Sequence, residues 1–263
     1  MGAAFSREFK RSRLKAAPTN LQSSIYNLQL ERGGIDLKDR LEHIQERIRQ
    51  TAKACGRSET DIRLVAVSKT MPVEIVKKAI ETGMTDFGEN YIQEAREKTS
   101  SLAQYPVTWH YIGHLQSNKA KYAVRMFDFI HSVDSLKLAR ELDKHAKKIA
   151  KVQAILIQVN VAKEDSKSGV YGEDILSLLR DISQFENLAV KGLMTMPPYF
   201  NAPDKVRPFF AALRGLRDQI KNENIPNISM DELSMGMTGD FEAAIQEGAT
   251  MIRVGTAIFG ERH

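Results

Sequence analysis

The stretch LVAVSKT, residues 64–70, is a run of small and β-branched apolar residues that ends on a lysine. Such a run is typical of a strand that is buried on both faces, as in a parallel sheet. A bare ammonium group in that environment costs several kcal/mol. Lys69 is therefore solvated, paired or covalently bonded, and the rest of the chain has to distinguish these cases.

Apolar segments of strand length recur along the chain, with amphipathic helical segments between them. Strands that alternate with helices form a parallel sheet, and eight such units form a (β/α)8 barrel. The predicted fold class is therefore α/β, a TIM-type barrel. We expect strands at residues 62–68, 85–87, 107–112, 127–133, 153–161, 188–194, 231–234 and 251–255.

An extra helix is predicted ahead of the first strand, at residues 37–56. Only seven residues follow Thr256, so we expect this helix to cover the place of a full helix after strand eight. A chain of 263 residues suits one barrel domain, which we assign to residues 36–263. Residues 1–35 are assigned to an N-terminal extension that we expect to be disordered.

The net charge of +5 is concentrated at the amino terminus, where residues 1–20 contain five basic residues and one acidic residue. The nearly neutral remainder argues against a nucleic-acid partner. The start MGAAFS fits a loose myristoylation pattern, and the Arg-rich segment also resembles a transit peptide. The amino-terminal segment is therefore either a targeting or myristoylation signal or the result of a mis-assigned start.

Two further features of the composition bear on the compartment. No apolar run reaches the roughly 20 residues needed to cross a bilayer, so we expect no membrane partner. Cys55 is the only cysteine and has no partner for an internal disulfide. This favours a reducing compartment, and we predict a cytoplasmic protein.

Small and hydroxyl residues are expected at the carboxyl ends of strands seven and eight, where the chemistry of such barrels gathers. Glycines in these loops allow the backbone to approach an anion, and N–H groups and hydroxyls can bind it. The sequence therefore favours a phosphorylated ligand, although tight turns alone would also explain the glycines. The residues concerned are Ser234, Gly236, Thr238, Gly255 and Thr256.

Side chains alternate across a strand, so Val65, Val67 and Lys69 are expected on one face, as are Arg253 and Gly255 on strand eight. Closing the barrel makes strand eight the neighbour of strand one. We therefore expect Lys69 and Arg253 both to project into the barrel mouth. A nearby cation makes an amine more nucleophilic, which suggests a Schiff-base lysine in a pyridoxal phosphate protein or a phosphosugar aldolase. A solvated lysine is the alternative.

Several sequence blocks, in order over about residues 36–262, resemble the pyridoxal phosphate homeostasis protein family, also called the pyridoxal-phosphate-binding protein family. The resemblance implies a barrel like that of alanine racemase. The blocks include AVSKT (66–70), FGENYIQEA (87–95), WHYIGHLQSNK (109–119), IQVNVAKEDSKSG (157–169), ELSMGMTGDFEAAI (232–245) and MIRVGTAIFGER (251–262).

The resemblance also implies the site. Lys69 matches the lysine that holds pyridoxal 5'-phosphate (PLP) as an internal aldimine, and Arg253 matches the arginine beside the pyridine nitrogen. Thr238 stands where the family often has serine, which keeps the hydroxyl. His114 stands where it often has proline, which leaves its role open. The implied phosphate loops are Ser234, Gly236 and Thr238 with Gly255 and Thr256, and the implied pocket lining is Asn90, Asn160 and Met194.

The implied function is PLP binding in intracellular PLP (vitamin B6) homeostasis, without established catalytic activity, by a monomer whose further partners are apo PLP-dependent enzymes. An arginine beside the ring nitrogen stays protonated, so the ring is a weak electron sink. The alternative is a PLP-dependent amino-acid racemase or lyase, for which only His114 or Tyr111 offers an acid or base opposite Lys69. We expect no metal site, because the strand ends between His110 and His114.

Overall fold

The computed structural model describes residues 36–164, 166–198, 200 and 202–260. The predicted N-terminal extension, residues 1–35, lies outside the described residues. From Leu37 onward the chain forms one compact unit. None of the helices in the described ranges is long and apolar enough to span a bilayer.

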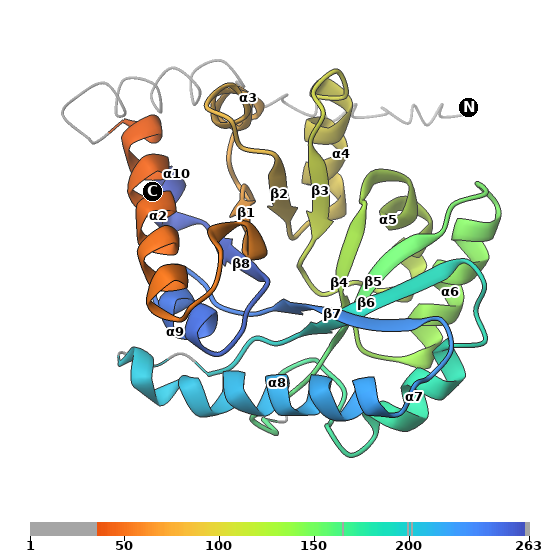
Figure 1. The fold of residues 1–263 in the computed structure, drawn as a ribbon. Helices are drawn as coiled ribbons and strands as arrows, with labels where there is room; N and C mark the ends of the chain where they lie inside the picture. The colour runs from red at the N-terminus through yellow and green to blue at the C-terminus, as the bar shows by residue number, and fades with distance from the viewer. Residues whose placement is uncertain (1–35, 165, 199, 201, 261–263) are drawn as a thin grey trace, which may run out of the picture. The chain divides into compact units, whose positions relative to one another are not determined.

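In the described part of the chain, eight parallel strands follow one another around a closed barrel, and β8 pairs with β1 (Figure 1). The predicted (β/α)8 barrel is therefore confirmed, with every expected strand present. The largest boundary differences are three residues: β7 begins three residues before the predicted start, and β5 ends three residues before the predicted end. The strands are β1 Arg63–Val67, β2 Asp86–Glu89, β3 Thr108–Tyr111, β4 Phe129–Val133, β5 Gln153–Gln158, β6 Leu188–Met194, β7 Ile228–Ser234 and β8 Met251–Val254.

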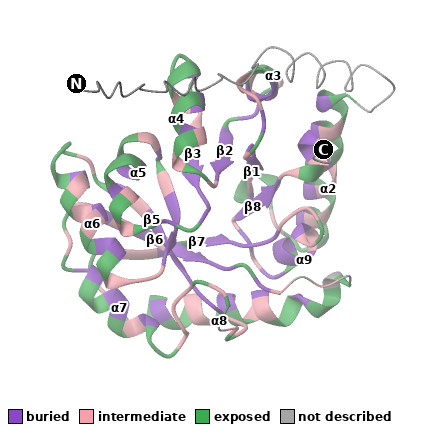
Figure 2. Ribbon diagram, turned by 180° about the vertical axis from the view of Figure 1, so that it is seen from behind, coloured by how far each residue is buried: buried purple, intermediate pink, exposed green. Residues whose placement is uncertain are grey.

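Helices surround the barrel and bury the faces that they turn toward it (Figure 2). The strands are buried almost throughout, as expected for a parallel sheet covered by helices. The helices are α2 Leu37–Ala54, α3 Val73–Glu81, α4 Ile92–Ser101, α5 Ala120–Met126, α6 Leu136–Lys147, α7 Ile175–Ile182, α8 Arg207–Asn222, α9 Phe241–Gln246 and α10 Thr256–Phe259, with 3₁₀ turns at Glu59–Asp61, Ser117–Lys119 and Pro203–Lys205.

The leading helix α2 lies against α9 and against α10, the short helix that follows β8. It buries a stripe of apolar residues at helical spacing, among them Leu41, Ile44 and Ile48. Arg47 of α2 donates from Nε to Glu242 Oε1 of α9 at 2.7 Å. As predicted, α2 covers the place of a full helix after strand eight.

The barrel interior changes character along its axis. An apolar layer is formed by Leu156, Met194 and Met251, with Phe129 packed against it. Charged side chains lie at the amino-terminal end, where Arg63 bridges carboxylates of β2 and β7. The carboxyl-terminal end, where the candidate site lies, therefore sits above a packed interior rather than an open channel.

Candidate functional site

Lys69 lies directly after β1, at the carboxyl-terminal end of the barrel, and is half-buried. The strand end is tied to β2 by a hydrogen bond from the Ser68 N–H to the Gly88 carbonyl at 3.0 Å. A second bond, from the Met71 N–H to the Ser68 carbonyl at 3.0 Å, closes a turn around Lys69. The position at the end of strand one is the one predicted from the sequence.

The turn that carries Lys69 is held from behind by Lys98 of α4, whose side chain is only 3% exposed. Lys98 Nζ donates to the Ser68 carbonyl at 2.6 Å and to Glu89 Oε1 at 2.7 Å. It also donates to Glu94 Oε1 at 2.6 Å. Burial raises the pKa of Glu89, although the nearby Lys98 ammonium opposes that change. This buried cluster fixes the residue before Lys69.

The residue after Lys69 is held by the same cluster. The Thr70 N–H donates to Glu94 Oε1. Thr70 has φ +67°, a left-handed conformation that a β-branched residue rarely adopts. Glu94 and Lys98 therefore grip the backbone on both sides of Lys69, and this grip supports an unfavourable backbone conformation at Thr70. We name Glu89, Glu94 and Lys98 the turn clamp.

The loops after β7 and β8 meet at the predicted phosphate seat. Thr238 Oγ1 accepts a hydrogen bond from the Gly255 N–H at 3.4 Å and lies 3.3 Å from Thr256 Oγ1. Gly236 has φ +90°, and a Cβ there would lie 2.5 Å from the Ala244 Cβ. Only glycine therefore allows the first loop to pass this close to α9.

Ser234, also predicted for the phosphate seat, lies inside the barrel and is fully buried. Its Oγ accepts a hydrogen bond from Arg253 Nη1 at 2.5 Å and lies 2.9 Å from His131 Nδ1. The structure thus brings Ser234 together with Arg253 rather than with the hydroxyl groups of Thr238 and Thr256.

Arg253 is a buried cation, 3% exposed, whose guanidinium group contacts neutral acceptors. Besides Ser234, it donates from Nη2 to the Thr195 carbonyl at 2.9 Å. Burial lowers the pKa of Arg253 to about 10, and the Asp240 carboxylate opposes this. Among the described residues, none forms a salt bridge with Arg253. A buried guanidinium of this kind fits a ligand that supplies a further acceptor.

Arg253 lies deeper in the barrel than Lys69. The pairing of β1 with β8 places Arg253 opposite Val65, four residues before Lys69. The backbone positions of the two residues are therefore offset along the barrel, while the Arg253 guanidinium reaches the Thr195 carbonyl just past the end of β6. This separation suits a ligand that extends from the mouth into the interior.

The predicted lining residues have different surroundings. Asn90 Oδ1 is buried and accepts no hydrogen bond from the described residues, so it offers an acceptor or a contact to a ligand. Asn160 Nδ2 instead donates to the Glu164 carbonyl at 2.8 Å and to the Lys167 carbonyl at 3.2 Å, which orders the loop after β5. Met194 is fully buried in the apolar layer of the barrel.

A cavity of ≈ 230 Å³ opens beside Asn90 at the carboxyl-terminal ends of β2, β3, β5 and β6. His114 lies on its rim and is exposed, with Nδ1 3.3 Å from Ser168 Oγ. Tyr111 donates from its hydroxyl to the His114 carbonyl at 3.0 Å. Burial raises the pKa of Tyr111 to about 12, so its phenol stays protonated near neutral pH.

Sequence reasoning missed the turn clamp and the contact between His131 and Ser234. The spacing of Glu94 and Lys98 is a common helix-surface pair and does not reveal that Lys98 points inward. His131 follows the strand alternation of β4, which places it in the interior, yet nothing in the local sequence identifies its partner 103 positions away.

Comparisons with known proteins point to the same family as the sequence blocks quoted above. Residues 40–263 match the family described as alanine racemase, N-terminal domain. The pyridoxal phosphate homeostasis protein of Aquifex aeolicus is 43% identical over 224 residues, which cover 85% of this chain and 97% of that protein. Its namesake in Escherichia coli is 38% identical over 234 residues, covering 86% and 97%.

Two solved structures are similar to this chain over most of its length. PipY of Synechococcus elongatus PCC7942, solved with PLP bound, has a TM-score of 0.73 and 37% identity, covering 82% of this chain and 100% of that chain. An alanine racemase of Clostridium difficile 630 has a TM-score of 0.64 at 15% identity, covering 85% of this chain and 57% of that chain. The latter similarity concerns the fold alone.

Proposed function

Since this chain belongs to the pyridoxal phosphate homeostasis protein family, within the alanine racemase N-terminal domain family, we propose that it binds PLP and serves intracellular PLP homeostasis. The observation that carries the proposal is the alignment of three features along one side of the barrel. These are the clamped Lys69, the meeting loops of Thr238 and Thr256, and the buried Arg253, which lacks a salt bridge among the described residues.

Lys69 is the residue that would hold the cofactor covalently. When bound, PLP supplies an aldehyde that condenses with an amine and a ring that can withdraw electrons. The Lys69 amine would form a C=N bond with the aldehyde carbon, and one water molecule would leave. The turn clamp supports this role because it fixes the backbone on both sides of Lys69.

The phosphate group would occupy the loops after β7 and β8. Thr238 and Thr256 offer hydroxyl groups there, and Gly236 and Gly255 let the backbone approach an anion. Ser234 would act indirectly, because its hydroxyl group already contacts Arg253. Asn90, which follows β2 beside the strand that carries Lys69, would contact the cofactor at the cavity, whereas Asn160 and Met194 would shape the pocket.

Two features favour a carrier over a catalyst. A guanidinium group whose pKa is about 10 stays charged at neutral pH, so Arg253 would leave the ring nitrogen unprotonated and the ring a weak electron sink. Tyr111 is a poor acid or base near neutral pH because burial raises its pKa to about 12. We therefore propose a monomeric cytoplasmic carrier that supplies PLP to apo PLP-dependent enzymes and lacks catalytic turnover.

The first prediction tests the covalent site. The purified protein, loaded with PLP, is reduced with borohydride, and the labelled peptide is mapped by mass spectrometry. We expect one label, on Lys69, and we expect Lys69→Ala to lose the near-ultraviolet absorbance of the bound cofactor. Lys167→Ala is the matched control, because Lys167 is a half-buried lysine that lines the cavity. A label on another lysine, or no absorbance at all, contradicts the proposal.

The rival function, a racemase or lyase, is distinguished by α-proton exchange of amino acids in deuterated water. Exchange that Lys69→Ala abolishes would support the rival, whereas a loaded protein without exchange supports the carrier. Transfer is tested by mixing the loaded protein with an apo PLP-dependent enzyme and measuring how fast that enzyme gains activity compared with free PLP.

A further inference from the structure

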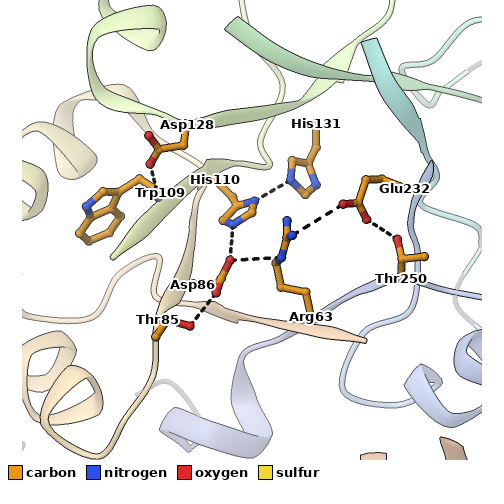
Figure 3. Close-up of polar contacts among 9 residues, drawn as sticks. All are labelled: Arg63, Thr85, Asp86, Trp109, His110, Asp128, His131, Glu232 and Thr250. Carbon is orange, nitrogen blue, oxygen red and sulfur yellow. Dashed lines mark hydrogen bonds and ion pairs between the residues drawn. The ribbon is translucent and has the colours of Figure 1, made fainter. Parts of the chain in front are cut away.

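A chain of buried hydrogen bonds runs through the barrel interior from β2 to β8. Asp86 Oδ1 lies 3.0 Å from His110 Nε2, and His110 Nδ1 lies 2.9 Å from His131 Nε2 (Figure 3). His131 Nδ1 lies 2.9 Å from Ser234 Oγ, which accepts from Arg253 Nη1 at 2.5 Å. We call Asp86, His110, His131 and Ser234 the interior relay.

The chemistry of the ends sets the direction of these bonds. Burial lowers the pKa of His131 well below its usual value, and His110 and then Arg253 lower it further, so His131 is neutral. Burial would raise the pKa of Asp86, but hydrogen bonds from His110 and Thr85 outweigh it, and the net shift is downward. Asp86 is therefore an anion and accepts the His110 Nε2 proton.

One arrangement leaves both imidazoles uncharged. His110 accepts at Nδ1 from the His131 Nε2–H, and His131 accepts at Nδ1 from the Ser234 hydroxyl. The Ser234 lone pairs then face Arg253, which can only donate. The opposite direction requires a doubly protonated, positively charged His110 beside Asp86, and it turns the His131 Nδ1–H toward Ser234, which Arg253 also faces as a donor.

The surrounding charges fit the uncharged arrangement. At the amino-terminal end, Arg63 lies 3.6 Å from Asp86 Oδ1 and 3.7 Å from Glu232 Oε1 (Figure 3). Asp240 is the charged group that acts on Arg253 from the loop ahead of α9. Aligned hydrogen bonds polarise one another in a buried, low-dielectric interior. Aligned in this way, the relay would transmit part of the charge of Asp86 to Ser234, the residue that contacts Arg253.

We propose that Asp86, His110 and His131 are positioning residues for Arg253: they orient the Ser234 lone pairs toward its guanidinium group and thereby set the charge that a bound cofactor ring meets. The part that concerns the ring rests on the proposed function. The part that concerns the relay does not, because every contact in it belongs to this chain alone.

The relay itself is tested on the full chain without cofactor. Nitrogen-15 NMR of labelled histidines reports both charge and tautomer. We expect the rings of His110 and His131, recognised by their contacts with each other, to be neutral and protonated at Nε2 at about pH 7. A doubly protonated, positively charged ring in either residue, or an Nδ1–H tautomer in either residue, overturns the proposal. This measurement needs no variant and no PLP.

The second prediction concerns the loaded protein. Asp86→Asn keeps the shape of the side chain but removes the charge. We expect the midpoint of the pH titration of the cofactor absorbance to fall by about 0.5 pH units or more, because a lost anion disfavours the protonated form of the lysine–cofactor bond. Asp128→Asn is the matched control, since Asp128 lies outside the relay and its Oδ2 accepts a hydrogen bond from the backbone N–H of Trp109 at 2.8 Å (Figure 3).

A double-mutant comparison shows whether the effect travels through Ser234. In a Ser234→Ala background, Asp86→Asn is expected to add no further shift. Equal midpoints for Asp86→Asn and Asp128→Asn, or an undiminished Asp86→Asn shift in that background, overturn the inference while leaving PLP binding intact. If none of these proteins binds PLP, the proposed function fails and the NMR result alone decides the relay.

Discussion

Gly236 shows how one residue constrains the loop after β7, the proposed phosphate seat. Its positive φ and the 2.5 Å approach of a Cβ to the Ala244 Cβ leave no room for a side chain. Gly239 in the same loop has open space where a Cβ would stand, with nothing within 4 Å. The two glycines therefore offer a matched pair for separating steric need from simple turn formation.

The third prediction follows from this pair. Gly236→Ala is expected to cost about 1–3 kcal/mol of folding stability or PLP affinity, because the backbone must leave its positive φ or move away from α9. Gly239→Ala is expected to change either quantity by less than about 0.5 kcal/mol. Urea unfolding and PLP titration check both. Equal effects of the two variants would mean that Gly236 is needed only to form a turn and not to avoid a clash with α9.

At the scale of the elements, β1 and α4 act as one unit around Lys69. The turn clamp joins the end of β1, the end of β2 and α4 through a single buried ammonium group. A buried ion pair adds little net stability compared with apolar packing, but removal of one partner leaves an uncompensated charge. Replacing one charged residue of the clamp should therefore destabilise the fold more than replacing both partners of an ion pair.

The fourth prediction uses that asymmetry. Lys98→Met is expected to lower the free energy of unfolding by about 3–5 kcal/mol, because Glu89 and Glu94 lose their shared cation. Lys98→Met combined with Glu89→Gln is expected to recover part of the loss. Lys77→Met, which removes an exposed helix pair with Glu81, is the control and is expected to cost less than about 0.5 kcal/mol.

Denaturant unfolding and PLP titration are both informative for these variants. A weakened PLP affinity in the double variant, at nearly restored stability, would assign the clamp a role in presenting Lys69. A Lys98→Met loss below about 1 kcal/mol would contradict the interpretation of the cluster as a buried, mutually dependent set.

The elements also show what the sequence can predict. The alternation of apolar strands with amphipathic helices predicted all eight strands and the covering role of α2, because those patterns are local and periodic. The positions of Lys69 and of the loops after β7 and β8 followed from strand ends. The turn clamp, the burial of Ser234 and the hydrogen-bond partners of Arg253 did not, because they depend on strand register and on contacts between distant residues.

At the scale of the whole barrel, the amino-terminal end is closed by charges rather than by apolar side chains. Arg63 lies between Asp86 of β2 and Glu232 of β7, and Thr250 donates to Glu232 Oε2 at 2.6 Å (Figure 3). These ion pairs connect the first two strands with β7 across the place where β1 pairs with β8 and closes the barrel. The stability of the barrel is therefore expected to depend on the ionisation of these carboxylates.

The fifth prediction concerns acid. The pKa of Asp86 is lower in the folded protein than the usual 3.8, so its ionised form favours folding. That contribution is complete above the unfolded-state pKa and is lost as the pH falls through the lower folded-state pKa. Between about pH 5 and about pH 3, Asp86→Asn is expected to lose less unfolding free energy than the parent protein or Asp128→Asn. Parallel losses in all three would contradict this.

The grip on Lys69 has a consequence for how a ligand is captured. A residue whose neighbours on both sides are fixed by α4 loses little further freedom when its amine reacts, so binding carries a smaller ordering penalty. Affinity for an aldehyde is then governed by the ease with which water reverses the bond, and not by rearrangement of the strand. If Lys69 binds PLP as proposed, capture and release would both proceed from a backbone that is already fixed.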